Sequence, residues 1–448
     1  MSAKRTWFRV HSFTGVITGL LLFVICWSGT FAVLSYELEW LVTPELRVDP
    51  EGEHVSWSAI INAVEQAYPS SEVSLLETPP YERSATRALV SLTGQPSRWV
   101  YVDPYSARIL GDASGFNIEQ FFRTFHYSFF QGDFGFYLIC SLAITLLISL
   151  IAAMVFYKRW WRRFFRLPHG QGRTFWSDLH RTAGLWAIWF VLIISVTGAW
   201  YLYEWAQYEL GLGKISYAGT DAEYALHVVP SPESALQARS VSLDALVGRV
   251  SSVRPELAVG SIRFRDDGAV YVDGQARHLL VRDRANQIHL DRNTGEVLYT
   301  QTPQDYSLYW RWSDTADPLH FGDFGGLWSK VIWFLFGLVL CGLILTGTWL
   351  HARRLARASG PSRHRWPGTG AAIVVSLGVL VASIPFGIEE IRSSGTQVAG
   401  VQHFPDLAYG VVAVIIGWIA LTLTIISGWV WLLWRAPSIS TVRKPSRR

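Results

Sequence analysis

The chain has 448 residues, of which 50% are hydrophobic and 17% are charged, and it carries a formal net charge of +4. This composition is too apolar and too weakly charged for an ordinary soluble enzyme of this length, so it predicts an integral membrane protein in a lipid bilayer. The small net charge argues against nucleic acid as a partner. The three cysteines lie inside long apolar stretches, which argues against a disulfide framework.

Six apolar stretches are long enough to cross a bilayer, which takes about 20 residues per helix. They are residues 12–36, 134–157, 180–203, 328–351, 370–391 and 406–434. No small-residue cleavage site follows the first stretch, so we expect it to remain as an uncleaved helix. Pro385 and Gly387 interrupt the fifth, but membrane helices tolerate such residues where neighbouring helices satisfy the freed backbone groups.

Lysine and arginine residues cluster before the first stretch and after the second, fourth and sixth. These places share one side of the membrane if both termini are cytoplasmic, as expected for a bacterial inner-membrane protein. The expected parts are 1–36 (N-terminus and first span), 37–125 (first periplasmic domain), 126–157 (second span), 158–179 (basic cytoplasmic loop), 180–203 (third span), 204–325 (second periplasmic domain), 326–351 (fourth span), 352–369 (cytoplasmic loop), 370–391 (fifth span), 405–434 (sixth span) and 435–448 (basic cytoplasmic tail).

The two periplasmic segments share one order of elements. In the first, a helical pattern over 55–64 precedes strands over 87–92 and 99–102. In the second, a helical pattern over 241–250 precedes strands over 269–272 and 278–282. The predicted fold class is therefore a mainly α membrane protein of about six transmembrane helices with two small α+β periplasmic domains, internally duplicated.

The membrane stretches repeat as well. Residues 11–15 (HSFTG) match 180–184 (HRTAG), and each histidine is followed 17 residues later by a hydroxyl residue and a glycine, at 28–29 and 197–198. A looser match relates His126, ahead of a Gly-Asp-Phe-Gly sequence, to His320, ahead of a second one.

Six histidines lie at or near the ends of the expected spans and fall on two levels. The cytoplasmic level holds His11, His180 and His351, and the outer level holds His126, His320 and His403. A pseudo-twofold axis along the membrane normal would place His11 opposite His180 and His126 opposite His320, which is the ligation of a b-type haem held between helices. We therefore predict two haem b groups.

Two alternatives stay open for these histidines. Each could be an interfacial polar residue that reaches water, and His351 or His403 could replace a ligand at its level. The other histidines lie in loops or soluble segments and are expected at the surface; they are His54, His169, His227, His278, His289 and His364.

Glycines and arginines accompany the histidines. Gly15 and Gly184 follow their histidines by one helical turn, where a missing side chain would let a flat macrocycle approach, although close helix packing also explains them. Arg123 and Arg181 lie near the expected haem levels and could pair with propionates, or could be membrane-edge charges. No nucleotide, flavin or hydrolase motif is present, so electrons would come from quinol or a separate reductase.

The order of these motifs resembles the PepSY-associated transmembrane (PepSY_TM) family over most of the chain. The resemblance rests on 11–29 and 180–198, on His126 and His320, on Thr346-Gly347-Thr348-Trp349 and on the two outside domains. It implies an inner-membrane di-haem oxidoreductase that reduces a ferric siderophore or another ferric chelate on the periplasmic side, releasing Fe(II).

Two other readings of the sequence compete with this one. The first is a haem-free PepSY anchor that binds a periplasmic partner or restrains a peptidase. The second is a transporter with a pathway near the interrupted fifth span, although few ionisable residues lie deep in the apolar runs.

Overall fold

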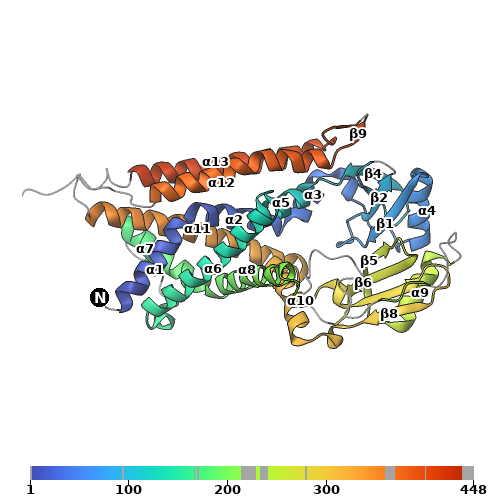
Figure 1. Cartoon of the computed structure of the whole chain (residues 1–448), viewed down its shortest axis with the longest axis horizontal. Helices are drawn as coiled ribbons and strands as arrows, with labels where there is room; N and C mark the ends of the chain where they lie inside the picture. The colour runs from blue at the N-terminus through green and yellow to red at the C-terminus, as the bar shows by residue number, and fades with distance from the viewer. Residues whose placement is uncertain are drawn as a thin grey trace, which may run out of the picture.

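A computed structural model describes residues 3–92, 95–165, 167–168, 171–212, 229–232, 241–277, 280–358, 369–398 and 400–435. A bundle of helices occupies one end of the molecule, and a single β-sheet with two helices on one face occupies the other (Figure 1). His169, His227 and His364 lie outside the described residues.

The bundle contains the elements that the apolar stretches predicted. Five helices are long and apolar enough to cross a membrane in the part of the chain that the structure describes, and α1 with α2 makes a sixth if that bent pair forms one span. The bundle elements are α1 (Ala3–Ile17), α2 (Gly19–Ala32), α6 (Gly132–Phe156), α7 (Arg173–Trp186), α8 (Ile188–Glu209), α11 (Gly326–Ala358), α12 (Thr369–Ser393) and α13 (Tyr409–Arg435). The prediction of a multi-pass membrane protein agrees with this architecture.

Two of the expected spans are broken helices, which corrects the predicted stretches 12–36 and 180–203. The chain bends by 67° between α1 and α2 at Thr18, and α7 gives way to α8 at Ala187. The two breaks share one backbone geometry, with φ −93° and ψ −1° at Thr18 and φ −89° and ψ 1° at Ala187. Hydropathy did not reveal the breaks because it records only how apolar each residue is, and the apolar run continues past each break. Backbone hydrogen bonds continue as well, as in the bond from the Leu22 amide to the Thr18 carbonyl.

The two breaks also fall at equivalent places in the sequence repeat. Thr18 lies seven residues after His11, and Ala187 lies seven residues after His180, since 18 − 11 and 187 − 180 are both 7. Each of these histidines therefore sits on a short helix, α1 or α7, that precedes the main span.

The two segments that were predicted to be periplasmic form one sheet rather than two separate units. The first contributes α4 (Trp57–Ala67), β1 (Ser71–Glu77), β2 (Thr86–Leu92), β3 (Arg98–Val102) and β4 (Ile109–Ser114), and the second contributes α9 (Leu243–Val253), β5 (Ala258–Phe264), β6 (Ala269–Gln275), β7 (Gln287–Asp291) and β8 (Val297–Gln301). The strand order is β4-β3-β2-β1-β5-β6-β7-β8, so β1 and β5 join the halves as an antiparallel pair. One hydrophobic core, which includes Val64 and Val250, lies between the sheet and its two helices.

Equivalent residues meet at the join between β1 and β5. Ser56 caps α4 and Ser242 caps α9, each accepting a hydrogen bond from the backbone three residues later, which sets an offset of 242 − 56 = 186 between the halves. Leu76 in β1 corresponds to Ile262 at this offset, and these two residues are partners in the β1–β5 ladder. Residues that pair with their own counterparts lie on a local twofold axis, so such an axis passes between β1 and β5 at this pair.

One predicted strand is wrong. Residues 280–282 of the expected strand 278–282 form a turn and a bend that lead into a single turn of 3₁₀ helix over Asp283–Ala285, and the next strand begins at Gln287; His278 and Leu279 lie outside the described residues. The apolar run that suggested a strand instead packs Val281 against Ala285 and Tyr306 in a small cluster.

Three further helices connect the sheet to the bundle. They are α3 (Ser35–Val42), α5 (Ile118–Ser128) and α10 (Leu308–Phe321). Helices α5 and α10 end in left-handed residues, at Phe129 and Gly322 respectively, and these turns lead into the spans α6 and α11.

His289 was expected at the surface and is instead fully buried in β7. Ile288 and Leu290 face the core beneath α9, so the alternation of a strand turns His289 to the opposite face, where its ring contacts Tyr271 and Tyr299. Burial, aided by the positive charge of Arg265, lowers the pKa of His289 to about 3.

The unfolding of the sheet should therefore depend on pH through His289. The unfolded histidine takes up a proton below about pH 6.5 whereas the folded one stays neutral, so stability falls as the pH drops from about 6.5 towards 3, by up to about 1.4 kcal/mol per pH unit. Thermal unfolding of the full chain in detergent, followed through its β signal, should show this fall. His289→Gln should flatten it and His54→Ala, on an exposed loop, should not; an unchanged slope in His289→Gln would contradict the assignment.

Candidate functional site

The outer level brings His126 of α5 and His320 of α10 together. Their ring centroids are 6.1 Å apart and their planes are inclined by 40°. Two imidazoles that bind one metal atom from opposite sides have centroids roughly 6 Å apart, since each metal–nitrogen bond is about 2 Å and each ring adds about 1 Å. The separation would therefore suit two imidazoles that hold one metal atom between them.

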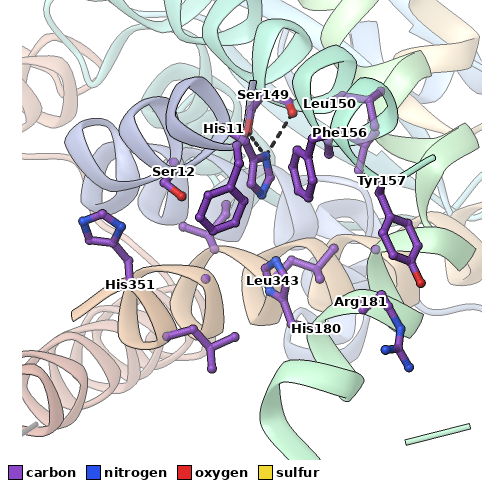
Figure 2. A pocket seen from close by; sticks show the side chains of 18 of the residues that line it. His11, Ser12, Ser149, Leu150, Phe156, Tyr157, His180, Arg181, Leu343 and His351 are labelled. Atoms are coloured by element: carbon purple, nitrogen blue, oxygen red, sulfur yellow. Dashed lines mark hydrogen bonds between the residues drawn. The ribbon is translucent and has the colours of Figure 1, made fainter. Parts of the chain in front are cut away.

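His11 of α1 and His180 of α7, which were predicted at the cytoplasmic level and form the inner pair, line one cavity of about 450 Å³. Their rings lie on opposite sides of this space in Figure 2. The cavity walls are mostly apolar side chains of α6, α8 and α11, and Gly15 and Gly184 line it as well. A Cβ atom placed on Gly15 would have no neighbour within 4 Å, and one on Gly184 would meet only Leu343 at 3.8 Å, so both glycines leave open space.

Hydrogen bonds fix the tautomer of two of the four histidines directly. The Nδ1 atom of His11 lies 3.0 Å from the carbonyl oxygen of Ser149, and the Nδ1 atom of His126 lies 3.0 Å from the carbonyl oxygen of Ile25. A carbonyl oxygen only accepts, so Nδ1 carries the proton and donates it in both cases. The Nε2 atom then keeps its lone pair, which is the form that binds a metal.

The other two histidines reach the same state through threonine hydroxyls. His180 Nδ1 lies 3.0 Å from Thr346 Oγ1, and His320 Nδ1 lies 2.7 Å from Thr197 Oγ1. Each hydroxyl donates its own hydrogen to a backbone carbonyl one turn earlier, at 2.7 Å in both cases. Its oxygen is therefore the acceptor, and Nδ1 again carries the proton. Within the described residues, none of the four Nε2 atoms makes a hydrogen bond.

These contacts explain the 17-residue spacing in the sequence. The residues 17 positions after the inner histidines are Ser28 and Thr197, and both contact the outer histidines, with Ser28 Oγ 3.3 Å from His126 Nδ1. Gly29 is required beside this contact, because a Cβ there would lie 2.6 Å from the His126 ring. The inner partners Ser149 and Thr346 lie on α6 and α11. Thr346 opens the Thr346-Gly347-Thr348-Trp349 sequence noted above, but nothing in the sequence linked it to a histidine, and no motif marks Ser149.

His351 and His403 differ from these four residues. His351 lines the inner cavity, but its Nδ1 accepts a hydrogen bond of 2.8 Å from Arg354, so its Nε2 carries the proton and has no lone pair for a metal. His403 is exposed in the loop ahead of α13, and among the described residues it makes no ring contact with the outer pair.

The two predicted arginines also lie in different settings. Arg123 is exposed on α5. Arg181 lines the inner cavity and donates from Nη1 to Asp178 at 2.8 Å, but its Nε and Nη2 atoms are buried without a partner among the described residues. The hydroxyl of Tyr157, which the sequence reasoning did not single out, is buried and unpartnered in the same cavity. Figure 2 shows both side chains at the end of the cavity away from His351.

The sheet is tied to the outer histidine pair by a buried charge cluster. Arg282 and Arg284, in the turn before β7, bind Asp317, which lies one helical turn before His320 and also accepts a hydrogen bond from Tyr201. Burial alone would raise the pKa of Asp317, but the two guanidinium groups hold that pKa below its usual value. Asp317 is therefore charged and fixes α10 to the sheet.

A profile of the PepSY-associated TM region matches residues 8–354, which is more than three quarters of the chain. The chain belongs to the PepSY-associated transmembrane family. No curated protein matches it. The family match includes all four paired histidines and ends before α12 and α13.

The residues of this PepSY-associated protein fit a haem at the inner level. The cavity supplies two imidazoles with free Nε2 atoms, open space at Gly15 and Gly184, and buried donors on Arg181 and Tyr157 that lack an acceptor. Carboxylates such as haem propionates would satisfy those donors. The described residues contain no cluster of three or more His, Cys, Asp or Glu side chains that could hold a bare metal ion. The histidines at each level are two metal-binding side chains, the number that a haem iron needs from the protein.

Gly15→Leu should separate haem binding from folding. The side chain would enter open space in the protein alone but would occupy the space that a macrocycle needs, so haem content should fall by about half while the melting temperature changes little. Gly378→Leu in α12, which also meets nothing within 4 Å, is the matched control. Full haem content in Gly15→Leu would argue against a macrocycle in this cavity.

Proposed function

We propose that this protein is a b-type di-haem electron carrier of the bacterial inner membrane, and that it reduces a ferric siderophore or another ferric chelate on the periplasmic side. The observation that carries the proposal is the shared state of His11, His180, His126 and His320. Each donates through Nδ1 to a neighbouring helix and keeps the Nε2 lone pair. A histidine that merely reached water at the membrane edge would not need an acceptor placed in this way.

The family membership and the geometry support a specific assignment of residues. His11 and His180 would hold the inner haem, with Arg181 and Tyr157 at its carboxylates, and His126 and His320 would hold the outer one. Bound haem supplies one-electron transfer at each level. The chain itself holds each imidazole in its metal-binding tautomer and excludes water with the apolar walls of the bundle.

The duplicated pattern supports the placement of the haem levels. Helices α1 and α7, with the same break after each, would bring the inner histidines to the cytoplasmic side, where basic residues cluster. Helices α5 and α10 carry the outer histidines next to the sheet, which would lie in the periplasm. Electrons would therefore enter near the inner pair, from quinol or a separate reductase, and leave beside the sheet.

Reduction by one electron is sufficient to release iron. Fe(III) is a hard, highly charged ion that oxygen ligands hold tightly, whereas Fe(II) is softer and is held more weakly by the same ligands. A quinol donor would give up two electrons and two protons and would reduce two ferric ions. No protein nucleophile takes part.

Haem content is the first test. The protein purified in detergent after expression with ample haem should contain about two b-type haems per chain by pyridine haemochrome assay. His11→Ala and His126→Ala should each lose one haem, whereas His351→Ala and His54→Ala should keep both. A wild-type chain without haem would overturn the proposal and favour the haem-free PepSY binding protein.

Iron release is the second test. Anaerobically reduced protein mixed with a ferric hydroxamate should be reoxidised while a ferrous-specific chelator captures about one Fe(II) per electron transferred. His126→Ala, which should lack the outer haem, should slow this reaction at least tenfold. Reoxidation at the wild-type rate in His126→Ala would contradict an exit route through the outer pair.

A further inference from the structure

Helices α12 and α13 lie outside the family match and contact both helices that define the position of His126. On one side, Trp418 of α13 makes edge-to-face contacts with Phe121, Phe122 and Phe125 of α5, with ring centroids 5.3 to 5.9 Å apart. Phe125 directly precedes His126. Gln120, six residues before His126 on α5, donates to Glu390 of α12 at 3.0 Å.

On the other side, α13 holds α2 at the residue next to the histidine's partner. Trp27 donates from Nε1 to Thr422 Oγ1 at 2.9 Å, and Trp27 directly precedes Ser28, which contacts His126. Trp418 and Thr422 are one helical turn apart, so one face of α13 contacts both α5 and α2.

The same face of α13 reaches the inner level through Trp429. Its Nε1 atom donates to the carbonyl oxygen of Leu345 on α11 at 3.2 Å, and Leu345 directly precedes Thr346, the partner of His180. Trp429 follows Trp418 by 11 residues, which is about three helical turns or roughly 16 Å. Helix α13 therefore contacts the bundle beside both histidine pairs, at Trp418 and at Trp429.

We propose that the α12–α13 hairpin is a positioning element for the haem ligands. Trp418 and Thr422 hold the helices around His126, and Trp429 holds the part of α11 that carries Thr346, the hydrogen-bond partner of His180. The two tryptophans act by different means. Both are buried, but the Trp418 Nε1 atom has no hydrogen-bond partner among the described residues, so its ring packing carries its effect. Trp429 depends on its N–H. This inference rests on the proposed function, because the histidines it positions are ligands only if haem binds.

The substitution of each tryptophan by phenylalanine separates packing from hydrogen bonding. Trp418→Leu should shift the reduction potential and the low-spin EPR signal of the haem that His126→Ala removes, and Trp418→Phe should restore both, because an aromatic edge remains. Trp429→Leu and Trp429→Phe should both shift the signal of the other haem, because neither can donate to Leu345. Trp434→Leu, at an 81% exposed position of the same helix, is the matched control.

The level-specific pattern distinguishes positioning from general stabilisation. If the tryptophans only stabilised the fold, their loss would lower the content of both haems together. The haem still bound would then keep its reduction potential and its EPR signal. Unchanged signals in Trp418→Leu, or equal shifts of both haems in either leucine variant, would overturn the inference while leaving a two-haem wild type, and thus the proposed function, intact.

Hydrogen exchange provides a readout that needs no haem. Trp418→Leu should speed amide exchange in α5 by about tenfold relative to Trp434→Leu and leave α7 unchanged, because α5 would lose its contact with α13. If wild-type protein proves free of haem, the proposed function fails, yet faster exchange confined to α5 would still support the hairpin as a brace for this helix. Unchanged exchange in α5 would overturn the brace as well.

Discussion

The hydrogen bond from each histidine Nδ1 to an oxygen on a neighbouring helix is the contact on which the rest of the bundle depends. It joins α1 to α6, α7 to α11, α5 to α2 and α10 to α8. A donor buried among apolar side chains needs its acceptor at a fixed place, so these four bonds determine how the helices are aligned along their axes. They also leave each imidazole with one free nitrogen. A single kind of contact thus sets both the packing and the chemical state of the site.

The symmetry of these contacts explains much of what the sequence could predict. His11 and His180 were recognised because the residues around them repeat without gaps, and the repeated hydroxyl 17 positions later is now seen to serve the outer histidines. The partners on α6 and α11 could not be predicted, because the sequence does not show how far two antiparallel helices are shifted along each other. Tyr157 was missed for a similar reason. Its importance lies in an unpartnered hydroxyl, which only a three-dimensional arrangement reveals.

Local patterns also failed where neighbouring elements decide the outcome. The helix breaks at Thr18 and Ala187 contain no proline and lie within or beside apolar runs, and the glycine after the first break, Gly19, is one of many in these runs, so hydropathy alone predicted straight spans. His289 occupies a strand position that alternation assigns to the face away from the core, and the burial of that second face depends on the rest of the molecule. His351 was a candidate ligand by position, and it is the adjacent Arg354 that gives it the opposite tautomer.

The pairing of Leu76 with Ile262 has a consequence for chains of half this length. A chain with only the first half would end its sheet at β1 and leave that edge without partners, and a chain with only the second half would do the same at β5. Because Leu76 pairs with its own counterpart and the neighbouring pairs are arranged symmetrically about it, a second copy of the same half could take the missing place with the same register. The joined sheet is thus built like the interface of a symmetric dimer, with the basic loop after α6 as the covalent link that makes the second copy unnecessary.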